Sequence, residues 1–447
     1  MAVPRSIRLF YLIAIELARK YTRSLVLGFC VGLFLSFLFW KLYPVVITPL
    51  IHHVDRVGII GDFTPSNLPQ SIQELISGGL TALTPDGSAK PALASSWEAT
   101  NSGKTYIFTL RRDLTWHTGR AVTSHDINYN IRGVTLIPTG DDTLTAYLQY
   151  PYSPFPTLIS KPIFMPGLKG FGPYEVSGIS LQGDSVKSLQ LTPVNLAGSS
   201  PKDYVFYQTE AQAITAFKLG EVNALEELST SSGLTNWRNV SIERNTKYNR
   251  IVTLFFNMHD PKLEDKNIRQ GLAYGVPDLS YERARSPLSK TSWAYTTTNV
   301  RQYDYDPVQA KKLIGHTEIA TTSAQLTLST FSQYLDVAQS IAASWTSLGI
   351  NTKVQVENDV PSTYQVLLSA QDVPPDPDQY LFWHSTQSQT NVTGYVNVKI
   401  DKLLEDGRQE LDQTKRKVIY ADLQRRLVED TPAVFLYYPT TYTVTRK

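Results

Sequence analysis

The chain begins with one long apolar stretch, and the rest of its 447 residues alternate short apolar segments with polar turns. Residues 25–47 are apolar except at Ser36 and Lys41, which gives enough helix for the roughly 30 Å hydrocarbon layer of a membrane. Basic residues crowd the start of this stretch, and Trp40 and Tyr43 suit the opposite interface. The pattern predicts one transmembrane helix with its amino terminus in the cytoplasm.

A cleavable signal peptide shares the basic start and apolar middle of this segment. The stretch is long, however, and no small-x-small cleavage site precedes the aromatic residues at its end. We therefore expect an uncleaved anchor over 24–47, after a cytoplasmic tail over 1–23 and before a linker over 48–54. The remaining chain would lie outside the cell membrane, on its periplasmic or cell-surface side.

Beyond the linker, the apolar periodicity alternates between that of strands and that of helices. Residues 104–111 alternate as in a half-buried strand, and Thr84–Gly87 has proline and glycine at the positions that a turn favours. An amphipathic helix is predicted over 335–348, and a second helix over 415–429 precedes an apolar strand at 433–438. Mixed elements in this order predict an α/β protein of more than one domain.

Composition agrees with a folded protein, at 42% hydrophobic and 18% charged residues. The net charge of +2 comes from the first 47 residues, so no nucleic-acid surface is indicated. The only cysteine, Cys30, lies inside the apolar stretch, and the histidines show no metal-site spacing. No phosphate-binding loop or nucleophile elbow is present either. We expect no metal, no cofactor and no catalysis.

Several motifs follow one another in a fixed order. The segment 90–132 combines a Pro-x-Leu-Ala element, a strand ending in Leu-Arg, a Trp-His-x-Gly element and an aspartate opening a helix. Later come Gly-Pro-Tyr, a helix ending in Gly-Glu-Val, Phe-Asn with Arg-Gln-Gly-Leu, and Asp-Pro-Asp. The positions that carry them are Pro91, Leu93, Ala94, Trp97, Leu110, Arg111, Trp116, His117, Gly119, Asp126, Gly172, Tyr174, Gly220, Phe256, Asn257, Arg269, Leu272, Asp376 and Asp378.

This series resembles the family 5 extracellular solute-binding proteins, the peptide- and nickel-type receptors of ABC importers. The resemblance implies a two-lobed α/β fold of the periplasmic-binding-protein type, here with its extra subdomain trimmed. The first lobe would comprise 55–255 and 433–447, and the second 256–432. Two chain crossings, near 252–257 and 433–438, would act as a hinge that lets the lobes close on a ligand.

The resemblance also implies where a ligand is held. An extended peptide offers a charged amine and unpaired backbone groups, so a receptor needs an acid and an exposed strand edge. The matching acid is Asp372, after the strand that contains Gln371. The loop to Asp376 is one residue longer than in dipeptide-binding relatives, and a turn-capping role for Asp372 stays open. The other candidate ligand-binding residues are Asp62, Phe63, Thr64, Trp383, Tyr437 and Tyr438.

The resulting hypothesis is a monomeric, membrane-anchored receptor that binds short peptides and delivers them to ABC permease subunits. A receptor for another small solute, such as a metal complex or a sugar, is the nearest alternative. A tethered sensor that feeds no permease is another. The cytoplasmic tail is too short for a signalling domain, which favours transport.

Overall fold

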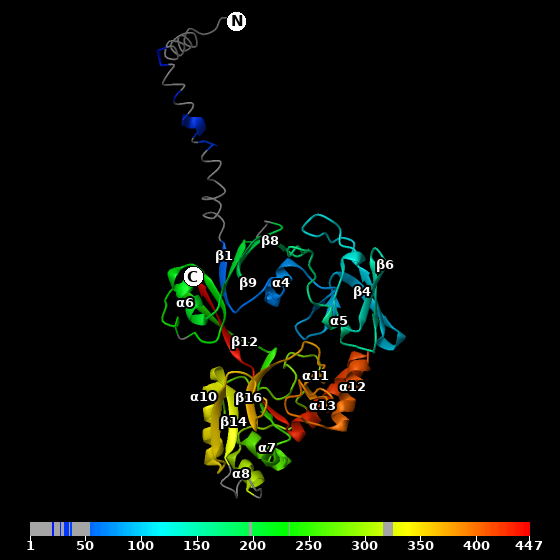
Figure 1. Cartoon of the computed structure of the whole chain (residues 1–447), viewed down its shortest axis with the longest axis vertical. Helices are drawn as coiled ribbons and strands as arrows, with labels where there is room; N and C mark the ends of the chain where they lie inside the picture. The colour runs from blue at the N-terminus through cyan, green and yellow to red at the C-terminus, as the bar shows by residue number, and fades with distance from the viewer. Residues whose placement is uncertain are drawn as a thin grey trace.

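The computed structural model describes residues 54–195, 199–231, 233–315 and 325–447, together with residues 20, 21, 27, 31–34, 36 and 37 (Figure 1). The predicted tail, anchor and linker lie outside the described residues apart from these few early positions. Within the described part of the chain, no helix is both long enough and apolar enough to cross a membrane.

The first lobe is built on a seven-stranded mixed sheet in the order β12-β18-β11-β1-β10-β9-β8. Its three central strands β1, β10 and β11 are parallel to one another. The pairs formed by the outer strands, β10–β9, β9–β8, β11–β18 and β18–β12, are all antiparallel. One apolar cluster lies between this sheet and α4 (Gln70–Ile76), and another lies against α6 (Glu210–Leu219). The strands are β1 (Asp55–Ile60), β8 (Tyr174–Gln182), β9 (Ser185–Pro193), β10 (Lys202–Tyr207), β11 (Ala224–Leu228), β12 (Val240–Thr246) and β18 (Thr440–Arg446).

A subdomain over residues 80–165 is inserted in the first lobe and has its own core. Its strand β5 alternates buried and exposed residues, with Tyr106, Phe108 and Leu110 inside, as the sequence predicted. The antiparallel sheet has the order β4-β5-β7-β6. Its elements are β2 (Thr81–Leu83), β3 (Ala89–Pro91), β4 (Ala94–Thr100), η2 (Asn101–Gly103), β5 (Thr105–Leu110), η3 (Ser124–Asp126), β6 (Val134–Gly140), β7 (Thr143–Leu148) and α5 (Phe155–Leu158).

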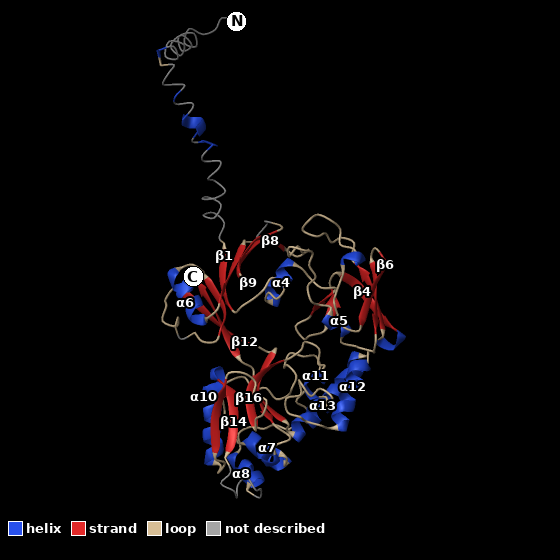
Figure 2. Cartoon of the chain, in the orientation of Figure 1, coloured by secondary structure: helices blue, strands red, loops and turns tan. Residues whose placement is uncertain are grey.

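The second lobe has a five-stranded sheet in the order β15-β14-β16-β13-β17, and α10, α7 and α13 belong to the helices that surround it (Figure 2). Strand β13 is buried from Ile251 to Phe256, which explains why all of these residues except Thr253 are apolar. The strands are β13 (Arg250–Phe256), β14 (Leu326–Phe331), β15 (Thr352–Glu357), β16 (Val366–Asp372) and β17 (Ala433–Tyr437). The helices are η4 (Pro261–Leu263), α7 (Lys266–Tyr274), α8 (Pro307–Ile314), η5 (Ser332–Tyr334), α10 (Leu335–Ser347), α11 (Tyr380–Trp383), α12 (Val398–Gln409) and α13 (Gln413–Asp430).

The chain crosses between the two sheets twice, once between β12 and β13 and once between β17 and β18. The crossings therefore fall at residues 247–249 and 438–439. The boundaries expected at 255 and 433 lie inside or at the start of strands β13 and β17, which both pair within the second sheet. An apolar run does not show which sheet its strand belongs to. The boundaries predicted from the sequence therefore fall several residues inside the second lobe.

The Trp-His-x-Gly element and its aspartate hold the subdomain together. Buried Trp116 donates its indole N–H to Asp126 at 3.2 Å, and the His117 ring contacts the Gly172 carbonyl oxygen at 3.0 Å. Asp126 also accepts the backbone N–H of Thr123 and so closes a capping box. The helix expected here is a single 3₁₀ turn, and the motif has a structural role.

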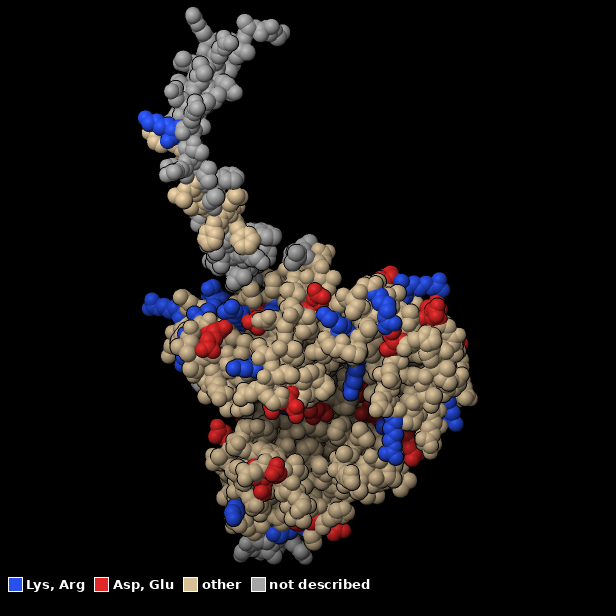
Figure 3. Space-filling model, turned by 45° about the horizontal axis from the view of Figure 1, so that its top comes forward, with Lys and Arg blue, Asp and Glu red and all other residues tan. Residues whose placement is uncertain are grey.

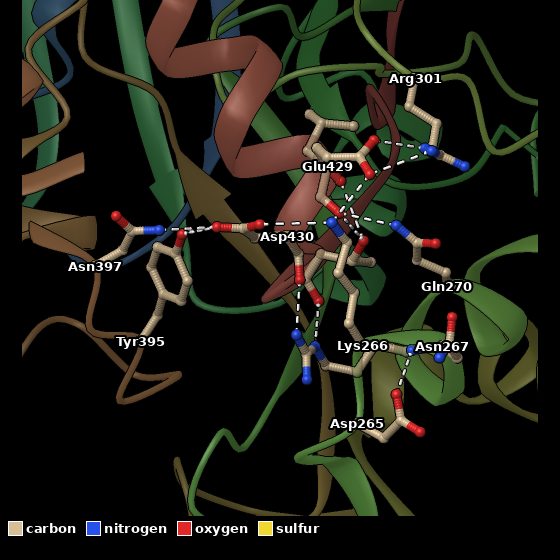
Figure 4. Close-up of polar contacts among 12 residues, drawn as sticks. Asp265, Lys266, Asn267, Gln270, Arg301, Tyr395, Asn397, Glu429 and Asp430 are labelled. Atoms are coloured by element: carbon tan, nitrogen blue, oxygen red, sulfur yellow. Dashed lines mark hydrogen bonds and ion pairs between the residues drawn. The ribbon is translucent and has the colours of Figure 1, made fainter. Parts of the chain in front are cut away.

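The Arg-Gln-Gly-Leu element of α7 supports the carboxyl end of α13 (Figure 4). The guanidinium of buried Arg269 donates to the carbonyl oxygens of Asp430 at 2.8 Å and Thr431 at 3.1 Å. Gln270 donates to the carbonyl oxygen of Glu429 at 2.9 Å. The last carbonyls of a helix have no partner within it, so these side chains stabilise the helix end. The side chain of Glu429 is in turn held by Arg301 at 2.6 Å.

Candidate functional site

The strand directions bring the carboxyl ends of both sheets toward the same space. Strand β12 runs in the same direction as β1, β10 and β11, and its end leads into the second lobe. Strand β13 starts at this crossing, and antiparallel β16 therefore ends beside it. The carboxyl ends of β1, β10, β11, β14 and β16 thus border one groove between the lobes, the usual place for a ligand in α/β proteins. Figure 3 shows a hollow between the lobes with acidic side chains along it.

Asp372 is the last residue of β16, and its carboxylate is exposed at this groove. Its side chain is 74% exposed and accepts a hydrogen bond from Arg250 Nε at 2.7 Å. The two residues are direct partners across the β13–β16 ladder, and the Arg250 side chain is 50% exposed. The predicted acid is therefore accessible but already has a basic partner. Arg250 is a candidate residue that the sequence reasoning missed.

The strand before Asp372 offers an unpaired edge. Strand β14 pairs with β16 only at Val366, Leu367 and Leu368, because the chain then turns away into η5. Among the described residues, no strand pairs with the β14 side of β16 over residues 369–372. Gln371 lies in this stretch and pairs with Ile251 on the other side. An extended ligand could add to this edge through its main chain.

The three candidates from the first lobe follow β1. Asp62 is exposed at the groove side of the sheet, whereas Phe63 packs against Phe206 with ring centroids 5.3 Å apart. The Phe63 carbonyl oxygen accepts the Val186 N–H at 2.7 Å, so this backbone group already has a partner. Thr64 lies in a turn, where its carbonyl oxygen accepts the Asn67 N–H at 2.9 Å. Asp62 is therefore the member of this set that most readily meets a ligand.

The three aromatic candidates differ in burial. Trp383 is fully buried and packs edge-on against Phe435, and Tyr438 is fully buried with its hydroxyl bonded to Lys290 N–H at 2.8 Å. Both belong to the core of the second lobe, so neither exposes its ring to a ligand as the sequence analysis expected. Tyr437 is covered by Tyr281, which stacks on it with centroids 4.2 Å apart and is itself exposed. Tyr281 takes the exposed position expected for Tyr437.

The first-lobe side of the groove is acidic. Glu226 and Glu227 lie at the end of β11, and Glu227 is paired with Lys247 of the crossing segment. Burial raises the pKa of Glu226 above its ordinary value, and the neighbouring Glu227 charge adds to this effect. This side of the groove therefore presents two carboxyl groups, of which Glu227 already has a basic partner.

Two further aspartates follow Asp372 in the same loop, and each faces an arginine. Asp376 and Arg416 form a buried two-bond pair at 2.6 and 3.0 Å, with 9% and 7% side-chain exposure. Asp378 accepts from Arg408 Nε at 2.8 Å. Burial raises the pKa of Asp378 although Arg408 opposes this shift. Through these two pairs, the Asp-Pro-Asp element helps to fix the conformation of the loop.

The loop also packs against the subdomain of the first lobe. Gly87 has φ +86°, and a Cβ there would lie 2.2 Å from the Pro375 carbonyl oxygen. Nearby, the Trp293 N–H donates to the Asp86 carbonyl oxygen at 3.1 Å. The Ser153 N–H donates to the Arg408 carbonyl oxygen at 2.7 Å. The lobes are thus bridged opposite the crossings as well, and the extra loop length at 373–375 is used in this contact.

This arrangement defines a two-lobed binding protein with a groove between its lobes. A family model described as bacterial extracellular solute-binding proteins, family 5 Middle, matches residues 88–148 and 202–391. The chain belongs to this family. It is accordingly a solute-binding protein and not an enzyme.

Curated relatives are distant. The oligopeptide-binding protein OppA of Bacillus subtilis is 22% identical over 451 residues, covering 81% of this chain and 82% of that protein. The oligopeptide-binding protein AppA of the same organism is 26% identical over 226 residues. This second match spans 43% of the chain and less than half, 42%, of AppA.

Solved structures show the same fold. The ABC transporter substrate-binding protein CtaP of Listeria monocytogenes matches with a TM-score of 0.75 and 21% identity, covering 88% of this chain and 94% of that one. NikZ of Campylobacter jejuni, in complex with Ni(L-His), matches with a TM-score of 0.71 and 20% identity over 88% and 94%. The α/β periplasmic-binding-protein fold expected from the sequence is confirmed.

Proposed function

We propose that this chain is the receptor of an ABC importer, and that it captures a short peptide outside the membrane between its two lobes. The observation that carries the proposal is the unpaired edge of β16, which ends at the exposed carboxylate of Asp372. A peptide in extended form needs such an edge for its main chain and an acid for its amine. The peptide-binding names of OppA and AppA support this choice of ligand.

Binding proceeds by closure of the lobes about the crossings at 247–249 and 438–439. The ligand first meets β16 and Asp372 in the second lobe. Closure then brings Asp62 and the acidic end of β11 over it and removes water. Charge pairs inside the closed groove are stronger than at an open surface, because the local dielectric constant falls. The chain makes and breaks no covalent bond.

Ligand that stays bound through purification tests this function. Full-length protein is purified without denaturant, and mass spectrometry identifies the small molecules released on unfolding. We expect peptides of a few residues, and titration of the emptied protein with the same peptides should restore binding. Recovery of a sugar would contradict the peptide assignment, while a receptor role would stand.

A metal complex is the second candidate, because NikZ shares the fold and holds Ni(L-His). Among the residues that the structure describes, no three His, Cys, Asp or Glu side chains gather as metal ligands. Titration with nickel and histidine together, against nickel alone and peptide alone, separates the candidates. Tighter binding of the nickel–histidine mixture than of any peptide would favour this alternative.

The membrane anchor over residues 24–47 is part of the proposal. Its support is the length of the apolar stretch and the basic residues before it. Alkaline extraction of membranes should leave the full chain in the pellet. Release of the full chain into the supernatant would contradict the anchor and leave the receptor role untouched. Release of a shortened chain would instead agree with a signal peptide that is cleaved after export.

A further inference from the structure

A cavity with basic side chains lies along the outer edge of the second-lobe sheet. Residues 281–285 run beside β17, where Arg283 forms an antiparallel bridge with Tyr437. A cavity of about 370 Å³ opens next to this segment. Strands β17 and β13 lie between the segment and β16, so the cavity is separate from the free edge of β16 in the groove. Its lining includes three basic side chains, one acidic side chain and two hydroxyls, which belong to Arg283, Arg285, Lys290, Glu282, Tyr295 and Thr297.

Arg283 differs from the other basic residues of this cavity in its partners. Within the described residues, its half-buried side chain makes one hydrogen bond, from Nη2 to the Tyr303 carbonyl oxygen at 2.6 Å, and no ion pair. Burial lowers the pKa of Arg283, and Asp304 opposes this effect only from beyond ion-pair distance. A guanidinium removed from water is stabilised when a carboxylate or a phosphate faces it. The other N–H donors of Arg283 therefore suit an anion.

The remaining charges at the cavity pair with one another. Arg285 Nη1 lies 3.1 Å from Asp304 Oδ1, and Lys290 is paired with Glu282. Three basic side chains thus face two acidic ones, which leaves one positive charge, on Arg283. A hollow with an excess of one sign of charge concentrates ions of the opposite sign. The cavity therefore attracts anions.

A second cavity that touches Arg283 is too small for such an anion. It is enclosed, has a volume of about 20 Å³ and is also bordered by Arg285, Ala433 and Phe435. This space holds roughly one water molecule. Water satisfies hydrogen bonds but brings no negative charge to the guanidinium. A counterion must therefore reach Arg283 through the larger cavity.

We propose that the larger cavity is a second ligand site, separate from the peptide groove, and that it binds the phosphate group of a small molecule. Guanidinium groups match phosphate oxygens through paired, charge-assisted hydrogen bonds. The hydroxyls of Tyr295 and Thr297 make no hydrogen bond to another described residue and can donate to further oxygens. A phosphate offers more acceptor oxygens than a carboxylate, so it suits donors from two segments, 283–285 and 290–297. The ligand is either free phosphate or a small phosphate ester.

Calorimetry of the full-length protein with three anions tests this site. Inorganic phosphate, glycerol 3-phosphate and acetate are titrated at one ionic strength, which is set with sodium chloride. The variants are Arg283→Gln, which removes the charge, and Tyr295→Phe, which removes one hydroxyl and keeps the ring. Arg112→Gln is the matched control, because Arg112 pairs with Asp142 on the subdomain at 2.5 Å. Arg250→Gln tests whether phosphate binds in the groove instead.

We expect the parent protein to bind phosphate, and to bind acetate about tenfold more weakly. Arg283→Gln should lower the phosphate affinity about tenfold, as for the loss of one charge-assisted contact. Tyr295→Phe should lower it about threefold, and neither Arg112→Gln nor Arg250→Gln should change it. Tighter binding of glycerol 3-phosphate than of phosphate would assign an ester as the ligand, and the reverse order would assign the free ion.

Three results would overturn the phosphate site. They are acetate binding as tightly as phosphate, an unchanged phosphate affinity in both cavity variants, and a loss of phosphate affinity in Arg250→Gln. If Arg283→Gln does not fold, Tyr295→Phe and the comparison with acetate still decide the result. Each of these failures would leave the peptide receptor standing, because the cavity and the groove are separate.

Discussion

Two arginine–aspartate pairs stand only four residues apart along one loop, yet their environments are opposite. Asp372 and Arg250 are 74% and 50% exposed and share one hydrogen bond, whereas Asp376 and Arg416 are 9% and 7% exposed and share two. Arg416 also donates to the Gly407 carbonyl oxygen and lies over the Trp293 ring. Burial opposes the charged state of Arg416, but the Asp376 carboxylate raises its pKa.

The difference shows how one loop can join a ligand contact to a rigid support. An exposed pair contributes little to stability, because water screens it, and its atoms stay available to a partner. A buried pair stabilises the fold only as an intact unit, because either member alone would be an unpaired charge in the interior. The three residues between the pairs include Pro375, which contacts the subdomain. The loop therefore ties the groove to the contact between the lobes.

The largest effect should come from breaking the buried pair. We expect Arg416→Ala to lower the free energy of unfolding by about 3–5 kcal/mol, because it leaves Asp376 buried without a partner. Urea denaturation followed by far-UV circular dichroism measures this loss. The double variant Arg416→Met with Asp376→Leu should recover most of it. A loss below 1 kcal/mol for Arg416→Ala would mean that water reaches the pair.

The loop between the two pairs contacts the subdomain through Pro375, and this contact can be tested at Gly87. An alanine there must adopt a left-handed φ and would also collide with the Pro375 carbonyl oxygen, so we expect a loss of about 3 kcal/mol. Gly119→Ala is the control, because Gly119 has φ +83° but nothing within 4 Å of a Cβ. That variant should lose only about 1 kcal/mol. Equal losses would show that strain, and not the inter-lobe contact, decides the result.

The Asp378–Arg408 pair is intermediate in exposure between the other two pairs, since the side chain of Asp378 is 9% exposed and that of Arg408 is 26% exposed. Its folded pKa is raised above the ordinary value of 3.8, so folding favours the protonated form. The stability penalty is fully present above the folded pKa and disappears below the unfolded value. The parent should therefore gain stability relative to Asp378→Asn as the pH falls from 7 toward 4. Urea denaturation of both proteins at each pH measures this difference, and the opposite trend would contradict the direction of the pKa shift.

The smallest effect on stability belongs to the exposed pair. Asp372→Asn and Arg250→Gln should each change the free energy of unfolding by less than about 1 kcal/mol. The change should shrink further in high salt, because ions screen exposed charges. Denaturation in low and high sodium chloride measures it. A salt-independent loss of several kcal/mol would place this pair with the buried one.

The sequence predicted secondary-structure elements better than it predicted which side chains contact one another. The alternation in β5, the turn at Thr84–Gly87 and helix α13 follow from local patterns, and each is present. The motif order identified the family. Arg250 was missed because its partner lies 122 residues away, across a ladder whose register no local signal gives.

Burial of aromatic residues was equally hidden. Trp383 and Tyr438 stand near the ends of their elements, where a sequence leaves core and groove equally open. Trp383 at the end of α11 packs against Phe435, and the Tyr438 hydroxyl accepts a hydrogen bond from the Lys290 N–H. Tyr281 has no neighbouring pattern that marks it, and only the stacking on Tyr437 places it at the groove. Tertiary packing decides these positions.

Strand β1 enters the first lobe with Asp55 at the edge of the sheet opposite the groove, and β18 brings the carboxyl end of the chain to the same edge. A capture tag attached at the carboxyl end would therefore hold the protein by the side opposite the groove. On a sensor chip coated through such a tag, the opening between the lobes would face the flowing solution. Ligand exchange could then be followed in real time without the coupling chemistry obstructing entry.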